Sequence, residues 1–534
     1  MAEDVVKEQE QVESSFIENE SEGLETACYR KCHGQFCLTS TENHFQHEIS
    51  LDYSPFQDAL TNYSSTTYTK MESLLKLDHS IDRIRNLIKN KHITCVDLAL
   101  FYLKRVQMTN DFYKIIIELN PHLLTEAQQL DKEFNENQIN NKLLFGCVAG
   151  IKGNISIRDM YNDAGCLILG RTNLSEWAYS VTENAPSGFS AVGGQCLHPD
   201  DIHEDVSGSS SGSAAGIKLN LFTFSIGTET QGSLLSPAMN VRNVCTLKPS
   251  LGTWPNQDII PVNYDQDTCG PMTRNIKDVE LLHKIASGIK TNAEDDSRSL
   301  RVGYLGQSQD GIVLLQTLSA LLPSTTLIDL NKDLSLVSPM TNVMNTANLC
   351  DVTFLDFLCY ALARDVPLYL SSHASSYSHQ TLASIIEWNK SHPQYIPYGQ
   401  SLFIRAIESP ITQEMYDKYK QTLQEAFEKF TDLLKSKYSL DCLITIGNDD
   451  YFSCTTACGI PRANLTLDYY IPDHKQINIV VAGFSINDDL VILRLLQRLE
   501  KANLQAGRID TRTSFQKYIQ QPIRGAYQNG CSIL

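Results

Sequence analysis

The chain has 534 residues, long enough for one large enzyme domain or for two to three smaller ones. It carries 62 acidic and 44 basic residues, a formal net charge of -18. Because no Lys/Arg cluster is interleaved with aromatic residues, the composition argues against a nucleic-acid-binding protein.

Residues 1–76 are acidic, rich in Ser, Glu and Asn, and without sustained hydrophobic periodicity, so we expect a flexible extension that is not a secretory signal. Within it Cys28, Cys32, His33 and Cys37 resemble zinc ligands. No second CxxC pair follows at finger spacing, so we expect no metal. The 15 cysteines of the chain are an odd number and widely scattered, which is typical of reduced thiols and favours the cytoplasm.

Regular structure is predicted from about Ser80 onward. "SIDRIRNLI" has helical spacing, and Thr94 with Asp97 predicts a capping box for the helix "CVDLALFYLKRV". "YKIIIEL" predicts a buried strand, and "HLLTEAQQLDKEF" predicts another helix. Helices and strands continue to alternate along the chain.

The second half of the chain has the same alternation. "DCLITIG" and "INIVVAGF" predict strands, and long amphipathic helices are expected at 412–438 and 488–502. The fold class is therefore α/β. With no internal repeat and no long linker after residue 80, we expect one large domain over residues 77–505. No apolar run reaches the ~20 residues needed to span a bilayer.

The stretch "SGSSSGSAAGIKLNLFTFSIGTETQGS", residues 207–233, begins like a linker but continues with an apolar helix and a strand. Small residues next to buried elements let backbone amides approach a ligand closely. The two polar loops that flank this apolar segment therefore predict a binding site.

Lys152 lies in "LLFGCVAGIKGNI", which is otherwise apolar and Gly-rich. Desolvation lowers the pKa of an ammonium, and a neutral lysine can act as a general base. The two Ser-rich loops offer nucleophiles for such a base. The alternatives are ordinary roles: a solvated surface lysine, a turn or helix cap at Ser209, and a helix N-cap at Ser233.

Several motifs occur together and in order: "GIKGNI", "LILGRTNLSEWA", "GSSSGSAAG", "GTETQGSLLSPA", "LKPSLG" and "QDTCGPMTR". In this combination the chain resembles the amidase signature family of serine hydrolases, within the peptide amidase-like and fungal or bacterial amidase subgroup. The resemblance extends over roughly residues 78–505. It implies a single large α/β domain with a central mixed β-sheet covered by helices on both faces.

The resemblance also implies the roles of three residues. Ser233 is the nucleophile, Ser209 is the middle relay at a cis peptide bond, and Lys152 is the base. The implied activity is hydrolysis of a carboxamide C–N bond through an acyl-enzyme, without a metal or organic cofactor. Its substrate would be a small-molecule or peptide amide.

The family's oxyanion hole and its supporting residues also have counterparts here. The oxyanion hole corresponds to backbone N–H groups of Thr230, Gln231, Gly232 and Ser233. Supporting positions around the site correspond to Thr228, Glu229 and Asp267.

The chain departs from the family pattern beside the site. The segment "GNISIRDMYND" after Lys152 is short, and Gly153, Gln231 and Leu235 replace the usual residues. Compared with the family pattern, we also expect one extra residue between Pro237 and Lys248. These changes leave open a second hypothesis from another class, a catalytically impaired paralogue that acts as a binding or scaffold protein.

Substrate-contacting segments are expected in the second half. "ALARDVPLYLSSHASS" to "SLFIRAIESP" predicts helices over the cleft, and Trp177, Tyr179 and Tyr398 are candidates for an apolar acyl pocket or for plain core. The tail 506–534 ends in "CSIL", which fits geranylgeranylation of Cys531 and peripheral membrane attachment, or a frayed terminus. The oligomeric state has no signature in the sequence.

Overall fold

The computed structural model describes residues 31–32, 35–36, 50–76, 78–136, 142–156, 163–289, 298–305, 309–333, 353–373, 378–447, 455–467 and 476–505. The chain divides into two compact units, residues 1–44 and 45–534. In the first unit, an antiparallel pair of short strands is described, β1 (Lys31–Cys32) and β2 (Gln35–Phe36). Of the four residues considered and rejected as zinc ligands, Cys28, His33 and Cys37 lie outside the described residues.

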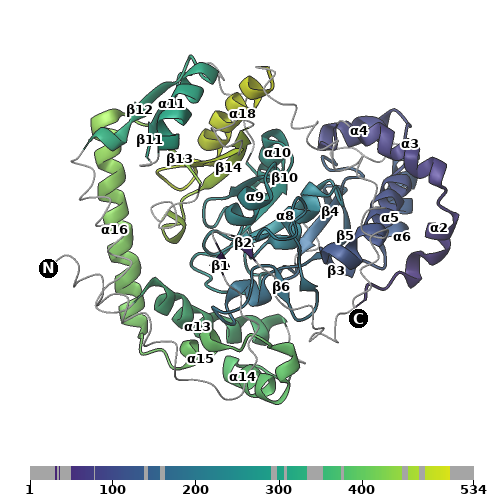
Figure 1. The fold of residues 1–534 in the computed structure, drawn as a ribbon, viewed down its shortest axis with the longest axis horizontal. Helices are drawn as coiled ribbons and strands as arrows, with labels where there is room; N and C mark the ends of the chain where they lie inside the picture. The colour runs from purple at the N-terminus through teal and green to yellow at the C-terminus, as the bar shows by residue number, and fades with distance from the viewer. Residues whose placement is uncertain are drawn as a thin grey trace, which may run out of the picture. The chain divides into compact units, whose positions relative to one another are not determined.

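The second unit is built on one mixed sheet of 11 strands (Figure 1). Their order is β12-β11-β13-β15-β14-β9-β10-β8-β4-β5-β3. β4 runs parallel to β5 and β8, and β11 runs parallel to β12 and β13. The bounds are β3 (Ile116–Leu119), β4 (Val148–Lys152), β5 (Leu167–Thr172), β8 (Phe224–Glu229), β9 (Cys245–Lys248), β10 (Thr268–Thr273), β11 (Arg301–Tyr304), β12 (Thr326–Asp329), β13 (Cys442–Ile446), β14 (Arg462–Leu467) and β15 (Ile477–Ala482). A separate antiparallel pair consists of β6 (Phe189–Ser190) and β7 (Gly194–Gln195).

Helices cover both faces of the central strands. Every residue of β4, β8, β10 and β14 is buried, which requires a cover on each side because successive side chains point to opposite faces. The helices are α2 (Gln57–Asn62), α3 (Ser65–Leu75), α4 (Ile81–Lys89), α5 (Cys95–Tyr113), α6 (Leu123–Asn135), α8 (Ser211–Lys218), α9 (Leu235–Val241), α10 (Ile276–Ser287), α11 (Gln309–Leu321), α13 (Phe354–His373), α14 (Leu382–Ser391), α15 (Ser401–Ile407), α16 (Gln413–Tyr438) and α18 (Asp489–Gln505). The predicted α/β class and mixed sheet are confirmed.

Most elements predicted from periodicity are present. The helices expected from residue 81, from residue 95 and over 412–438 are α4, α5 and α16, and Thr94 and Asp97 form the predicted capping box. The strand predicted within residues 207–233 is β8, which begins at Phe224 and ends at Glu229. No helix among the described residues combines the length and apolar character needed to cross a membrane.

The expectation of a flexible extension is wrong for residues 50–76. This segment forms α2 and α3, which both contact α5. Its buried side chains, none more than 4% exposed, belong to the main hydrophobic core: Phe56, Leu60, Met71 and Leu75. The helical periodicity is weak here, because four buried apolar side chains are spread over 27 residues. Cys531 and the remainder of 506–534 lie outside the described residues.

A group of helices lies to one side of the sheet. α13, α14 and α15 contact one another and are drawn together in Figure 1. Their apolar side chains form a core cluster of their own, which includes Val366, Ile386 and Phe403. The expected helices over the cleft correspond to α13 and α15.

Candidate active site

Lys152 is the last residue of β4, and its side chain points into the protein interior. It is fully buried, and its Nζ lies 2.7 Å from Ser209 Oγ and 2.8 Å from Thr228 Oγ1. Because β4 and β8 are parallel neighbours, their carboxyl ends meet at one edge of the sheet, and this edge brings Lys152 beside Thr228. Asn154 Nδ2 also donates to Thr228 Oγ1, at 3.2 Å.

The environment of Lys152 favours the neutral amine. Burial lowers the pKa of Lys152 to about 7, although the negative charges of Asp267 and Glu229 oppose this shift. An ordinary lysine is almost entirely protonated at neutral pH. Lys152 is therefore suited to accept a proton in the pH range in which most enzymes work.

Ser209 and Ser233 do not have the helix-capping roles that the sequence left open. The N-cap of α8 is Ser210, and the N-cap of α9 is Leu234. The Gly208–Ser209 peptide bond is cis, as the resemblance implied. Ser209 is buried, Ser233 is half-buried, and both line one pocket of about 420 Å³.

The loop between β8 and α9 presents free backbone donors beside Ser233. Gly232 adopts a left-handed conformation with φ 78°, which a residue with a side chain adopts only with strain. The backbone N–H groups of Gln231, Gly232 and Ser233 meet no acceptor among the described residues. Thr230 and Gln231 line the same pocket. The loop can therefore offer these donors to a bound group.

Glu229 anchors the end of this loop that leads into α9. Its Oε2 accepts the N–H groups of Leu234 and Leu235 at 2.9 and 3.2 Å, so the amides that follow Ser233 are already used. Its Oε1 accepts from Arg462, and both side chains are fully buried. Burial alone would raise the pKa of Glu229, but Arg462 and the two N–H groups bring the pKa below its usual value.

Asp267 anchors the start of the loop, at Thr230. Its Oδ1 accepts the hydroxyl proton of Thr230, and its Oδ2 accepts the N–H groups of Val262 and Asn263 at 2.8 and 2.9 Å. Burial raises the pKa of Asp267 to about 7. Thr228, Glu229 and Asp267 thus support the geometry around Lys152 and Ser233, as the resemblance implied.

Comparison with known proteins identifies the family of this chain. The Amidase family model matches residues 159–445, more than half of the chain. The chain belongs to the amidase family. The match begins after Lys152 and therefore does not include this lysine.

Individual relatives agree with the family. A probable amidase of Arabidopsis thaliana is 27% identical over 457 residues, covering 77% of this amidase and 88% of the relative. A putative amidase of Schizosaccharomyces pombe is 32% identical over 247 residues, 42% of each chain, so this match spans less than half of the relative's length. The crystal structure of peptide amidase from Stenotrophomonas maltophilia has a TM-score of 0.68 at 22% identity, covering 83% of this amidase and 98% of that chain, which shows a common fold.

The three aromatic residues considered for the pocket have different places in the amidase. Tyr179 lines the pocket. Trp177 instead packs edge-on against Phe403, with ring centroids 5.2 Å apart. Tyr398 packs edge-on against Phe189 at 5.0 Å. Of the two alternatives, Tyr179 therefore has the pocket position, whereas Trp177 and Tyr398 pack against other aromatic rings.

The start of the short segment after Lys152, residues 153–156, is anchored by backbone hydrogen bonds. Gly153 N donates to Thr172 O at 3.0 Å, and Ser156 N donates to Asp258 O at 2.8 Å. Ile155 forms an isolated bridge with Ile259. Residues 157–162 lie outside the described part of the chain.

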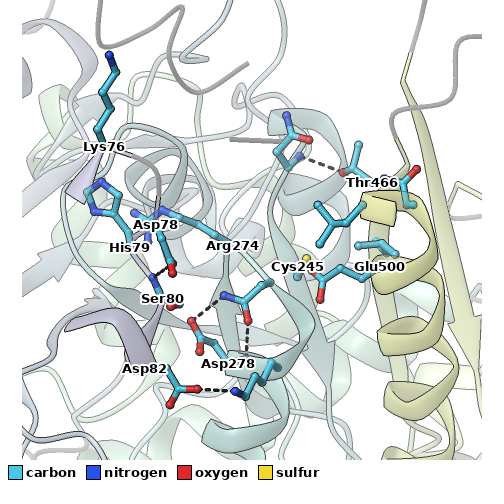
Figure 2. A pocket seen from close by; sticks show the side chains of 16 residues that line it. Lys76, Asp78, His79, Ser80, Asp82, Cys245, Arg274, Asp278, Thr466 and Glu500 are labelled. Atoms are coloured by element: carbon cyan, nitrogen blue, oxygen red, sulfur yellow. Dashed lines mark hydrogen bonds and ion pairs between the residues drawn. The ribbon is translucent and has the colours of Figure 1, made fainter. Parts of the chain in front are cut away.

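A second pocket, also of about 420 Å³, contains none of the candidate catalytic residues (Figure 2). It lies where α4, α10 and α18 approach one another. Glu500 accepts the N–H of Ile276 at the start of α10, and Asp278 accepts the N–H of Ile81 at the start of α4. Burial raises the pKa of Asp278 to about 6 and that of Glu500 to about 7. Asp278 and Glu500 therefore have structural roles at helix N-termini. Across the described residues, no group of three or more His, Cys, Asp or Glu side chains could hold a metal ion.

Two contributors to the site were not predicted from the sequence. Arg462 lies 233 residues after its partner Glu229, and no local pattern connects them. The sequence predicted a helix over the cleft at α13, but not which of its apolar side chains line the pocket. By contrast, the apolar run before Lys152 was a usable signal for β4.

Proposed function

We propose that this amidase hydrolyses a carboxamide C–N bond through Lys152, Ser209 and Ser233. The observation that carries the proposal is a fully buried lysine whose Nζ lies 2.7 Å from Ser209 Oγ, and Ser209 lines the same pocket as Ser233. Lysine in this environment is a general base, and no histidine is needed.

The reaction begins with a proton relay. Ser233 Oγ attacks the carbonyl carbon and gives its proton to Ser209 Oγ, while Ser209 gives its own proton to neutral Lys152. The oxyanion of the tetrahedral intermediate accepts N–H donors from Thr230, Gln231, Gly232 and Ser233. Preorganised donors of this kind contribute about 3 kcal/mol each.

The second half of the reaction uses the same groups in reverse. The intermediate collapses and breaks the C–N bond, and Lys152 returns its proton through Ser209 to the leaving nitrogen. Ammonia or an amine departs, and the acyl group remains on Ser233. Water then attacks the acyl-enzyme, its proton follows the same relay, and the carboxylic acid is released.

The alternative of an impaired paralogue depended on the short segment after Lys152. The described start of this segment, residues 153–156, is hydrogen-bonded to β5 and to the loop at Asp258, and Lys152 contacts Ser209 and Thr228. We therefore do not favour it. We further propose that the enzyme works in a reducing compartment such as the cytoplasm, because nine described cysteines are buried free thiols.

The function is tested by product formation. We expect ammonia to be released from at least one member of a panel of neutral primary amides, from short acyl amides to peptide C-terminal amides. A fluorophosphonate probe should add one adduct, and peptide mapping should place it on Ser233. Folded protein that neither releases ammonia nor takes up the probe would contradict the proposal.

A further inference from the structure

The pocket beside Ser233 has one apolar wall. α13 and α15 supply most of it, and Val262 adds to it from the loop before β10. The apolar residues that line it are Val262, Leu355, Leu358, Cys359, Leu362 and Leu402. We refer to this wall as the acyl wall.

The part of the acyl wall on α13 is one face of a helix. Residues 355, 358, 359 and 362 follow the spacing i, i+3, i+4, i+7, which places their side chains in one stripe. Leu362 is 1% exposed and Cys359 is 3% exposed, so both are nearly enclosed. Leu355 and Leu358 are half-buried and keep apolar surface open toward the pocket.

The pocket has almost no charge to offer a ligand. Among the described residues that line it, Glu183 is the only one with a charged side chain, and its carboxylate lies 3.8 Å from the guanidinium of Arg405. No lysine, arginine or histidine is part of the lining. A carboxylate placed against the acyl wall would therefore lose its hydration without gaining a cation.

We infer that this amidase acts on amides of uncharged, apolar carboxylic acids, with the acyl chain lying against α13, and that it discriminates against acyl groups that end in a carboxylate. The inference rests on the proposed function for its chemistry. The volume of about 420 Å³ falls within the range of small-molecule pockets, so it accommodates a substrate of that class.

The test uses two amides that differ only at the end of the acyl chain, hexanamide and its ω-carboxylate analogue adipamate. We expect kcat/KM to be about 100-fold higher for hexanamide, because an unpaired carboxylate in an apolar site is strongly disfavoured. Equal values, or a preference for adipamate, would overturn the inference.

A matched pair of variants on one helix tests the location. Leu358→Arg places a guanidinium on the acyl wall and should reduce the preference for hexanamide at least about tenfold. Leu368→Arg is the control, because Leu368 is on α13, 57% exposed and absent from the pocket lining. The control should keep the wild-type preference. An equal change in both variants would contradict a role for the acyl wall.

A binding measurement separates this inference from the proposed function. Ser233→Ala protein cannot form the acyl-enzyme, so equilibrium binding of hexanamide and adipamate to it reports on the pocket alone. Tighter binding of hexanamide supports the inference even if the wild-type protein releases no ammonia. Equal binding, or tighter binding of adipamate, rejects the inference even if the wild-type protein is an active amidase.

Discussion

Replacing Lys152 by methionine should lower kcat/KM for a neutral amide about 1000-fold while the protein remains folded. Loss of a general base typically costs two to four orders of magnitude, about 3 to 5 kcal/mol in transition-state free energy. Methionine has a similar length and no charge to desolvate, so the buried site stays filled. The measurement is steady-state ammonia release, with circular dichroism and the melting temperature as checks of folding.

A second buried lysine gives the matched control. Lys248 is also fully buried, and burial lowers its pKa to about 8, but its Nζ donates to Ile460 O and it does not line the pocket. Lys248→Met should therefore keep kcat/KM within about tenfold of the wild-type value, as expected for a residue outside the reacting groups. If the two variants lost activity equally, Lys152 would have no special role as the base.

Replacing Ser233 by alanine should abolish turnover, with a loss of about 10⁴-fold or more, and should also remove the fluorophosphonate adduct. The side chain is half-buried at the pocket and caps no helix, so its loss should change the melting temperature little. Ammonia release and intact mass after probe treatment measure the two effects. Retention of an adduct at full stoichiometry would show that another residue is the nucleophile.

The relay also predicts a non-additive result. If Lys152 acts only by activating Ser233 through Ser209, the double variant Lys152→Met/Ser233→Ala should be no slower than Ser233→Ala alone. A further large loss in the double variant would mean that Lys152 acts independently of the nucleophile.

Much of the fold was predictable because its signals are local. The capping box at Thr94 and the periodicity of α16 and α18 depend on residues within a few turns of one another. α2 and α3 were missed because their buried side chains are sparse among Ser, Thr and Tyr. Their stability depends on packing against α5, which a local reading cannot anticipate.

The candidate triad was predictable only in combination with the family motifs. Lys152 and Lys248 both lie next to apolar segments, both are fully buried, and burial lowers the pKa of both. Composition alone does not separate them. What separates them is Ser209, which the fold brings to Lys152 from 57 residues away.

The remaining parts of the site come from long-range packing. The Glu229–Arg462 pair joins β8 to β14 across the sheet, and the acyl wall is formed by helices that begin more than 100 residues after Ser233. Neither has a local sequence signature. Both depend on how the strands are ordered in the sheet, which the alternation of helices and strands does not specify.

The account depends most on a neutral Lys152, and the pH dependence of fluorophosphonate inactivation tests this directly. The neutral amine is the active form, so the rate should rise with pH, with a midpoint near the pKa of about 7, and then level off. Because burial also raises the pKa of Asp267 to about 7, Asp267→Asn is measured in parallel. In this variant the rise of the rate with pH should remain but move to lower pH, since the Asp267 carboxylate raises the pKa of Lys152. In Lys152→Met this rise of the rate with pH should disappear. A wild-type rate that is independent of pH, or one that rises only near the ordinary lysine pKa of about 10.4, would contradict the account.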